Sequence, residues 1–191
     1  VTEQVTGVDL VKAQIEIAAG EALTPTLSRI RERVDAGGSR VRALECRIYA
    51  EDPDNNFMPC PGKIGFLRNP EGPGVRVDSA MYAGGEISVY YDPMIAKLIT
   101  WGRDRAEAIH RMERALREYR IAGVITNIDF HQALLKTPEF QKGIYDTGFV
   151  ERNLKRLKRE IHEGDEEIAR MAVEIHRRTS SLTPAPSVPS G

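Results

Sequence analysis

The sequence lacks several features that would each indicate a particular class of protein. No run of 18 consecutive apolar residues occurs, so the sequence predicts no transmembrane helix. The formal net charge of the 191 residues is −1, which gives no support for binding to nucleic acid or to an anionic membrane. No segment has the form of a signal peptide, and no internal repeat is present. The overall composition, with 41% hydrophobic and 29% charged residues, is typical of a soluble globular protein.

Cysteine is also scarce. The two cysteines, Cys46 and Cys60, do not have the spacing of a metal site. Cys46 lies on the apolar side of a predicted strand, where we expect it to be a small core residue. A disulfide between the two would be unusual in the cytoplasmic location that we infer for this protein.

Residues 44–64 are the most informative stretch that is present. Apolar and polar side chains alternate from Leu44 to Tyr49, which is the period of a strand with one buried face. Glu45 and Arg47 therefore share the polar face and can pair there. Two proline-containing segments then stop the strand, because proline has no N–H to donate. A mid-strand arginine before such a loop suits a bound carboxylate, bicarbonate or developing enolate. The simpler interpretation is a structural Glu45–Arg47 ion pair on a solvated face.

The remaining elements are predicted from periodicity and turn residues. Their short linkers favour antiparallel neighbours, and together they predict an α+β fold with helices packed on one side of an antiparallel sheet. Strands are expected at residues 41–49, 63–68, 75–82, 86–91 and 94–101. Helices are expected at residues 8–19, from Asp104 onward, from Asn127 onward, and as a single turn opened by Thr137 and Pro138.

Local signals describe the two ends of the chain. Thr6 and Asp9 are expected to form a capping box at the first helix, with Asp in the position that Glu usually holds. Residues 23–40 are polar and predict a connecting loop. Residues 155–178 combine charges of both signs with spaced apolar residues, which predicts an amphipathic helical extension. Residues 179–191 are rich in Ser, Pro and Thr and are expected to be disordered.

Two longer motifs and several short ones carry a family resemblance. The longer motifs are Leu-Glu-Cys-Arg-Ile-Tyr-Ala-Glu-Asp-Pro at residues 44–53 and Phe-Met-Pro-Cys-Pro-Gly-Lys-Ile at residues 57–64. The short ones lie at residues 1–3, 6–9, 17–20, 74–76, 90–94, 97–99, 126–127 and 147–151. In this order and at this spacing they resemble the C-terminal domain of biotin carboxylase. This is the ATP-dependent half-enzyme of the acetyl-CoA, propionyl-CoA and pyruvate carboxylases. The resemblance covers roughly the first 154 residues.

The resemblance implies a domain organisation. Residues 1–40 would be the C-terminal end of an ATP-grasp domain, with one helix, and a connecting loop. Residues 41–154 would be the biotin carboxylase C-terminal domain, followed by the helical extension at 155–178 and the tail at 179–191. The chain begins with Val1 rather than Met, so we expect it to be part of a longer protein. The ATP, metal and base residues are expected upstream, and the 191-residue chain alone is expected to be inactive.

The resemblance also implies roles for individual residues. Arg47 matches the arginine that contacts bicarbonate and the ureido ring of biotin. Asp92 would lie near the biotin pocket and could orient Arg47, although an ordinary Asp-Pro turn explains it equally well. Thr147 matches a position lining the adenine pocket, where the family often has an aliphatic residue. Arg76 matches a position on the dimer interface, where Pro73 replaces a family phenylalanine and puts the strength of the contact in doubt.

The implied function is carboxylation of biotin on a carrier protein, with bicarbonate, ATP and Mg²⁺ or Mn²⁺. Its partners would be the biotin carboxyl carrier protein or domain, a carboxyltransferase and a second copy of the chain. The location would be the cytoplasm, or the mitochondrial matrix in a eukaryote. The alternatives are a non-catalytic module whose helical extension docks onto another protein, and a urea carboxylase-type ligase. The final carboxyl acceptor is set by the carboxyltransferase and is not encoded here.

Overall fold

The computed structural model of the chain describes residues 1–20, 41–158, 170–171 and 173–174. The chain divides into two compact units, Val1–Tyr145 and Asp146–Gly191. The expected loop at residues 23–40, the tail at 179–191 and most of the extension at 155–178 lie outside the described residues.

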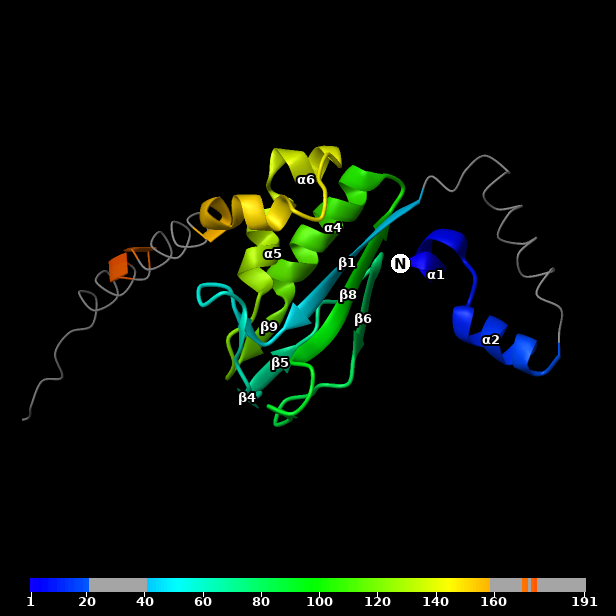
Figure 1. The fold of residues 1–191 in the computed structure, drawn as a ribbon, viewed down its shortest axis with the longest axis horizontal. Helices are drawn as coiled ribbons and strands as arrows, with labels where there is room; N and C mark the ends of the chain where they lie inside the picture. The colour runs from blue at the N-terminus through cyan, green and yellow to red at the C-terminus, as the bar shows by residue number, and fades with distance from the viewer. Residues whose placement is uncertain (21–40, 159–169, 172, 175–191) are drawn as a thin grey trace, which may run out of the picture. The chain divides into compact units, whose positions relative to one another are not determined.

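A three-stranded antiparallel sheet is the centre of the first unit. Its order is β1 (Arg42–Tyr49), β8 (Met94–Gly102) and β6 (Val75–Ser79), so β8 lies in the middle. Figure 1 shows β1 and β8 as the two long strands of the domain. Most side chains of β8 are buried, which fits its β-branched, apolar sequence. The antiparallel sheet is therefore confirmed, whereas its strand order joins segments that are far apart in the chain.

Helices cover one face of this sheet (Figure 1). Helix α4 (Arg105–Glu118) lies against all three strands, and α5 (Ile128–Leu135) and α6 (Pro138–Lys142) pack on α4. Asp104 begins α4 as predicted, because its side chain accepts a hydrogen bond from the Glu107 N–H at 2.8 Å. Thr137 begins α6, with Pro138 at the first helical position. The predicted α+β fold with helices on one side is confirmed.

The core lies between α4 and the sheet. Fully burying an Ile, Leu or Met side chain contributes about 1.5–3 kcal/mol, so a few such residues account for much of the domain's stability. Cys46 belongs to this core, as predicted. Its largest fully buried members include Ile48, Ile95 and Leu98 of the sheet and Met112 and Leu116 of α4.

Short strand pairs extend the domain beyond the central sheet. They are β2 (Glu51–Asp52) with β3 (Met58–Pro59), β4 (Gly62–Lys63) with β7 (Glu86–Ile87), and β5 (Phe66–Arg68) with β9 (Arg120–Ala122). The single strand expected at residues 63–68 is wrong, since the chain changes partner within it. Ile64 donates its N–H to Gly85, whereas Gly65 donates to Ala122 of β9. The strands expected at 75–82 and 86–91 also end earlier than predicted.

Two short helices precede the sheet domain: α1 (Thr2–Thr6) and α2 (Leu10–Ala18). The expected capping box is wrong, because Asp9 is itself the N-cap of α2 and accepts from the Lys12 N–H at 2.9 Å. Gly7 ends α1 with φ of 67°, a left-handed conformation that glycine adopts readily. The helix predicted at residues 8–19 therefore starts later, after a separate turn of helix.

The second unit begins at Asp146 and is helical over residues 149–158, 170–171 and 173–174. Asp146 Oδ1 accepts from the Gly148 N–H at 3.0 Å and from Arg152 Nη2 at 2.6 Å. The pKa of Asp146 is lowered, chiefly by this hydrogen bond from Arg152. Within the described part of the chain, no helix has the length and apolar character needed to cross a bilayer.

Candidate functional site

The face of the sheet opposite to α4 carries a row of charged side chains. Residues paired across antiparallel strands point to the same face, and the register pairs Arg47 with Lys97 and Lys97 with Asp78. Two residues further along β8, Ile99 pairs with Glu45 of β1 on one side and with Arg76 of β6 on the other. The row thus mixes acidic and basic groups, and Arg47 is at the end of it on the edge strand β1.

Arg47 remains open to a ligand. Its Nε atom lies 3.4 Å from Glu45 Oε1, which confirms the predicted pairing of the two side chains. The Arg47 side chain nevertheless keeps 59% of its surface exposed. Its pKa is raised first by a hydrogen bond with the Tyr49 side chain and then by Glu45. A guanidinium flanked in this way stays charged and presents a planar set of donors to an anion.

The backbone under Arg47 is held by the first turn of α5. Asn127 Nδ2 donates to the Arg47 carbonyl oxygen at 3.2 Å, and its Oδ1 accepts from the Tyr49 N–H at 3.0 Å. Asn127 is at the N-cap position of α5, as predicted, but its side chain makes no capping hydrogen bond. The prediction that it caps α5 is therefore wrong: the amide is engaged with β1 instead.

His131, one turn further along α5, reaches the same carbonyl. Its Nε2 lies 3.0 Å from the Arg47 carbonyl oxygen. Burial lowers the pKa of His131, and the hydrogen bond to Arg47 opposes this shift. The neutral imidazole with its proton on Nε2 is the form that donates to a carbonyl.

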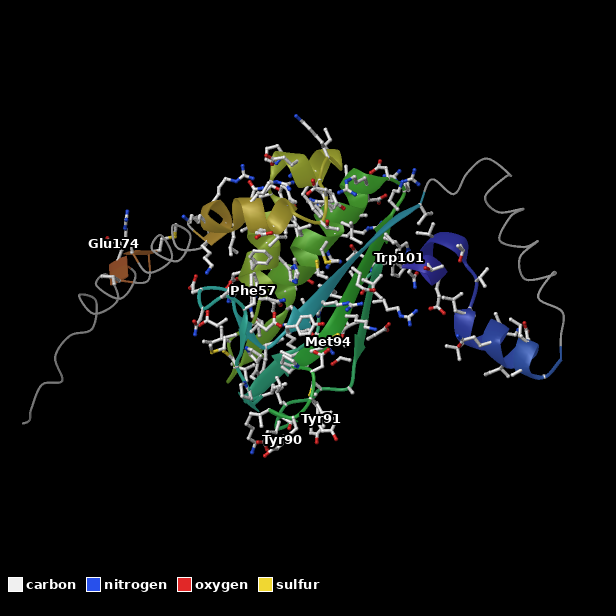
Figure 2. The ribbon with its side chains drawn as sticks, viewed as in Figure 1. Phe57, Tyr90, Tyr91, Met94, Trp101 and Glu174 are labelled. Atoms are coloured by element: carbon white, nitrogen blue, oxygen red, sulfur yellow. The ribbon has the colours of Figure 1, made fainter. Side chains whose placement is uncertain are left out.

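The loop between β2 and β3 packs on the same helix. The ring of Phe57 meets Phe130 edge to face, with ring centroids 4.9 Å apart. Asn56 and Phe57 both have positive φ, at 54° and 59°, which is uncommon for residues other than glycine. Figure 2 shows Phe57 beside α5, on the side of β1 away from β8. This contact ties the loop that follows the Arg47 strand to the helix that holds it.

Asp92 lies in the loop that leads into β8. Its Oδ1 accepts from the Met94 N–H at 2.9 Å, which is the geometry of an Asx turn. Burial raises the pKa of Glu51, and the Asp92 carboxylate raises it further, so these two acids lie near each other. Among the described residues, Glu45 and Tyr49 are the side chains that interact with the Arg47 guanidinium. Asp92 follows the exposed Tyr90 and Tyr91, which project from the end of the domain in Figure 2.

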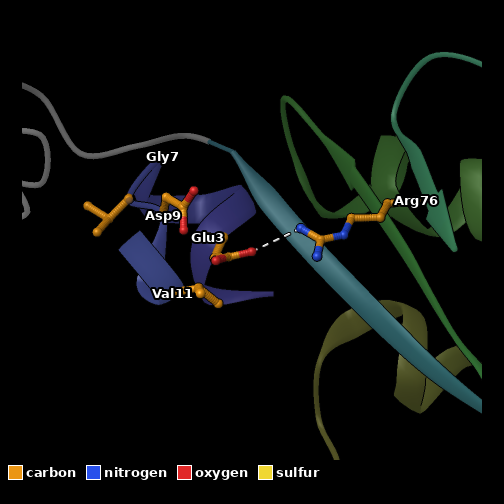
Figure 3. Close-up of a pocket in the computed structure, with 6 residues that line it drawn as sticks. Glu3, Gly7, Asp9, Val11 and Arg76 are labelled. Atoms are coloured by element: carbon orange, nitrogen blue, oxygen red, sulfur yellow. Dashed lines mark hydrogen bonds and ion pairs between the residues drawn. The ribbon is translucent and has the colours of Figure 1, made fainter. Parts of the chain in front are cut away.

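Arg76 is fixed by two acids. Its Nε bonds to Asp78 Oδ1 at 2.7 Å. Its Nη1 bonds to Glu3 Oε2 at 2.9 Å, which is the contact marked in Figure 3. Arg76 and Glu3 line a cavity of about 430 Å³ together with Asp9 and Val11 of the α1–α2 segment. The side chain of Arg76 is 41% exposed, so part of the guanidinium still faces solvent.

Thr147 belongs to the second unit, where it is exposed in the turn before the helix at residues 149–158. Cys46 and Cys60 are both free thiols, and burial raises the pKa of Cys46 to about 12. Among the residues that the structure describes, no group of three or more His, Cys, Asp or Glu side chains could hold a metal ion.

Sequence reasoning paired Arg47 with Glu45 but did not predict the other groups around the guanidinium. Tyr49 was visible as the next residue on the polar face of the strand, and Glu51 as the acid that follows it. Asn127 and His131 carried a signal only as polar residues on a short helix, and nothing in the sequence connects them to a strand about 80 positions away.

A family model called "Biotin carboxylase C-terminal domain" matches residues 45–152 of the chain. The chain belongs to the biotin carboxylase family. A biotin carboxylase from Nostoc sp. is 52% identical over 151 residues, which are 79% of this chain and 32% of that protein. A pyruvate carboxylase subunit from Methanothermobacter thermautotrophicus is 46% identical over 98% of this chain and 36% of its own length. That alignment continues past Leu154, where the sequence motifs had ended the resemblance.

Solved biotin carboxylase structures share the fold. The biotin carboxylase subunit of a pyruvate carboxylase is 42% identical with a TM-score of 0.75, over 82% of this chain and 33% of that one. The Hydrogenobacter thermophilus 2-oxoglutarate carboxylase biotin carboxylase domain, a dimer in complex with MgADP, ADP and bicarbonate, is 41% identical with a TM-score of 0.69. It is matched over 80% of this chain and 32% of its own. The chain thus spans about a third of the length of these biotin carboxylases.

Proposed function

We propose that the chain is the C-terminal portion of an enzyme that carboxylates biotin on a carrier protein, using bicarbonate and ATP with Mg²⁺ or Mn²⁺. The observation that carries the proposal is the exposed, permanently charged guanidinium of Arg47 on an edge strand. The backbone carbonyl of the same residue is held by a hydrogen bond from Asn127. The relatives are carboxylase subunits, and one solved relative holds MgADP and bicarbonate. The phosphate and metal ligands would lie in the part of the enzyme outside this chain.

Arg47 would act on the ureido oxygen of biotin. The ureido nitrogen is a poor nucleophile until it loses its proton, and the resulting negative charge is shared with the ureido oxygen. A fixed guanidinium stabilises charge that develops at that oxygen, because its donors need no reorganisation during the reaction. The same fork of donors would also orient bicarbonate, which matches it as a carboxylate does. Glu45 leaves the end of the fork available, since its contact is with Nε.

The other expected residues take supporting roles in this proposal. Asp92 would line the biotin pocket, with its carboxylate near Glu51, and Thr147 would line the adenine pocket. Arg76 would lie on a two-fold interface between two copies of the chain. The carrier protein and a carboxyltransferase would be the other partners, in the cytoplasm or the mitochondrial matrix. A urea carboxylase-type ligase, or a non-catalytic module that docks onto another protein, would be favoured over this function if Arg47 proved dispensable for biotin carboxylation.

The test uses the complete enzyme that contains this chain. Arg47→Lys keeps a cation but loses the planar fork, and Arg47→Ala loses both. Removing one donor of this kind typically lowers kcat by about 10²–10³, so we expect Arg47→Ala to lose biotin carboxylation by that factor. The KM for ATP should change little, because the proposal places Arg47 at biotin rather than at the nucleotide. Steady-state carboxylation and thermal melting measure both effects.

Arg103→Ala is the matched control. Arg103 is also an exposed arginine that pairs with a carboxylate, Glu107, at 3.0 Å, but it lies beyond the far end of β8. It should keep wild-type kcat. A folded Arg47→Ala enzyme with near wild-type kcat would leave the arginine as a surface ion pair and contradict the proposed function.

A further inference from the structure

Strand β1 is an edge strand whose outer side is closed by side chains instead of by another strand. Among the described strands it pairs with β8 alone, in the sheet order β1-β8-β6, so its outer backbone groups need other partners. The first turn of α5 supplies them. Asn127 bonds to Arg47 through its amide N–H and to Tyr49 through its amide oxygen, and its own backbone N–H donates to the Tyr49 carbonyl at 3.3 Å. These three hydrogen bonds take the place of those that a neighbouring strand would make with Arg47 and Tyr49.

The hydrogen bonds of Asn127 are placed at an irregularity of the sheet. Residues up to Ile48 pair with β8 one to one, but the register shifts between Ile48 and Tyr49, where a bulge occurs. The extra residue of this bulge is Ile95 of β8, which has no partner on β1. A bulge interrupts the ladder locally, so pairing with β8 fixes the backbone at Tyr49 less firmly than it does up to Ile48. Asn127 contacts the backbone on both sides of this point, so it fixes the local geometry that the sheet leaves free.

Asn127 uses its side-chain amide to bind β1 instead of capping α5. An asparagine at an N-cap normally bonds to a backbone N–H of the helix's first turn, which is worth about 1 kcal/mol. Here it makes no such bond, and the residue is only 5% exposed, so its amide is committed to β1. His131 donates to the Arg47 carbonyl from the next turn, and Phe130 anchors the same helix to the loop at Phe57. Two contacts from the start of α5 therefore reach the Arg47 strand, and a third reaches the loop that follows it.

We propose that Asn127 is a positioning residue for biotin carboxylation, acting through the backbone of Arg47 and supported by His131. This inference rests on the proposed function of Arg47. Groups that stabilise a transition state must be held within about 0.5 Å of the productive position. A misplacement of about 1 Å can cost about 10²-fold in rate. The Asn127 amide keeps the guanidinium within that range by fixing the carbonyl of its own residue.

The experiment compares variants of the complete enzyme. Asn127→Asp keeps an oxygen that accepts from the Tyr49 N–H, but its second oxygen cannot donate to the Arg47 carbonyl and repels it. We expect kcat for biotin carboxylation to fall about 10–100-fold, with the KM for ATP within about two-fold of wild type. The decisive measurement is the same substitution in an Arg47→Ala background. If Asn127 acts through Arg47, the second substitution causes no further loss, which is the non-additivity expected of coupled residues.

Thr100→Val is the control for loss of stability. Thr100 is fully buried on β8, and its hydroxyl donates to the Ala108 carbonyl at 2.9 Å. Its replacement should lower the melting temperature while kcat per folded enzyme stays unchanged. If Asn127→Asp fails to fold, His131→Leu gives the same test, since it removes the second donor to the Arg47 carbonyl.

The outcomes separate the two claims. An unchanged kcat in Asn127→Asp, or an equal loss in the wild-type and Arg47→Ala backgrounds, would overturn the positioning role while leaving Arg47 in place. A loss that only follows the fraction of folded protein would overturn it as well. Retention of activity by Arg47→Ala itself would overturn the proposed function, whatever Asn127 does.

Discussion

Tyr119 shows how a single atom can act against the stability of the fold. It ends α4, its side chain is only 2% exposed, and its ring belongs to the core. Its hydroxyl oxygen is buried, and none of the described residues forms a hydrogen bond with it. Burial raises the pKa of Tyr119 to about 12, because the phenolate would be even less favourable in this place. The buried ring stabilises the core, whereas the hydroxyl loses its hydrogen bonds to water on folding and destabilises the folded state.

Tyr119→Phe is therefore expected to stabilise the protein. The ring stays in place, and the desolvation penalty of about 1–3 kcal/mol for an unpaired buried hydroxyl is removed. We expect the free energy of unfolding of the 191-residue chain to rise by about 1 kcal/mol, measured by chemical denaturation. Tyr82→Phe is the control, since Tyr82 is exposed and should show no change. A destabilised Tyr119→Phe chain would mean that the hydroxyl has a partner after all.

At the scale of residues, the sequence predicted side chains that act along one strand but not those that meet across the fold. Glu45 and Arg47 could be paired from the strand period alone, because residues two apart share a face. The bond from Asn127 to the Arg47 carbonyl joins residues 80 positions apart. An N-cap preference is a local propensity, and here a tertiary contact overrides it. The core of α4 was predictable because its apolar spacing leaves only one face to bury.

At the scale of elements, the segment from Gly62 to Arg68 changes partner within a few residues. It pairs with β7 at its start and with β9 at its end, and Gly123 lies against the point of change. Gly123 has φ of +104°, and a Cβ there would collide with the Lys63 carbonyl oxygen and lie 2.8 Å from the Gly65 nitrogen. Periodicity along a strand carries no signal of its partner, so the sequence predicted one strand where there are two.

Gly123→Ala is expected to be strongly destabilising. The substitution adds a left-handed strain of about 1–2 kcal/mol to a collision with backbone that cannot move without breaking β4 from β7. We expect a loss of at least about 3 kcal/mol in the free energy of unfolding, measured by thermal or chemical denaturation.

Gly84→Ala separates the two causes. Gly84 has a similar φ of +92°, but a Cβ there would meet no atom within 4 Å. It should lose only about 1 kcal/mol, the cost of the backbone strain alone. Equal losses in the two variants would show that the approach of Lys63 to Gly123 is not a constraint on the fold.

At the scale of the whole molecule, the two faces of the sheet have different roles. One face buries the apolar core under α4, and the other carries the charged row that includes Arg47 and Arg76. Alternation along the strands predicted that the faces differ. It could not predict the order β1-β8-β6, because neighbours in this sheet are separated by long stretches of chain. That order is what brings Arg76 of β6 within one strand of the Arg47 strand.

Arg76 gives a test of the proposed assembly. We expect Arg76→Glu in the complete enzyme to shift the dimer toward monomer, because a carboxylate would replace a cation at the two-fold interface. Sedimentation velocity at low micromolar protein measures the shift. The substitution also places a third acid beside Glu3 and Asp78, so a local effect has to be separated from an interface effect. Arg76→Ala removes the cation without adding this repulsion and should weaken the dimer less.

Arg103→Glu reverses an arginine that is more exposed than Arg76 and precedes α4, and it should leave the sedimentation profile unchanged. If Arg76 only bonds to Glu3 and Asp78 within its own chain, both Arg76 variants should sediment as wild type does. A local loss would then show only in the melting temperature, and the interface would have to be sought on another face. A graded shift, with Arg76→Glu more monomeric than Arg76→Ala, is the result that a charge at a two-fold contact requires. At such a contact each substitution acts twice, once from each copy of the chain.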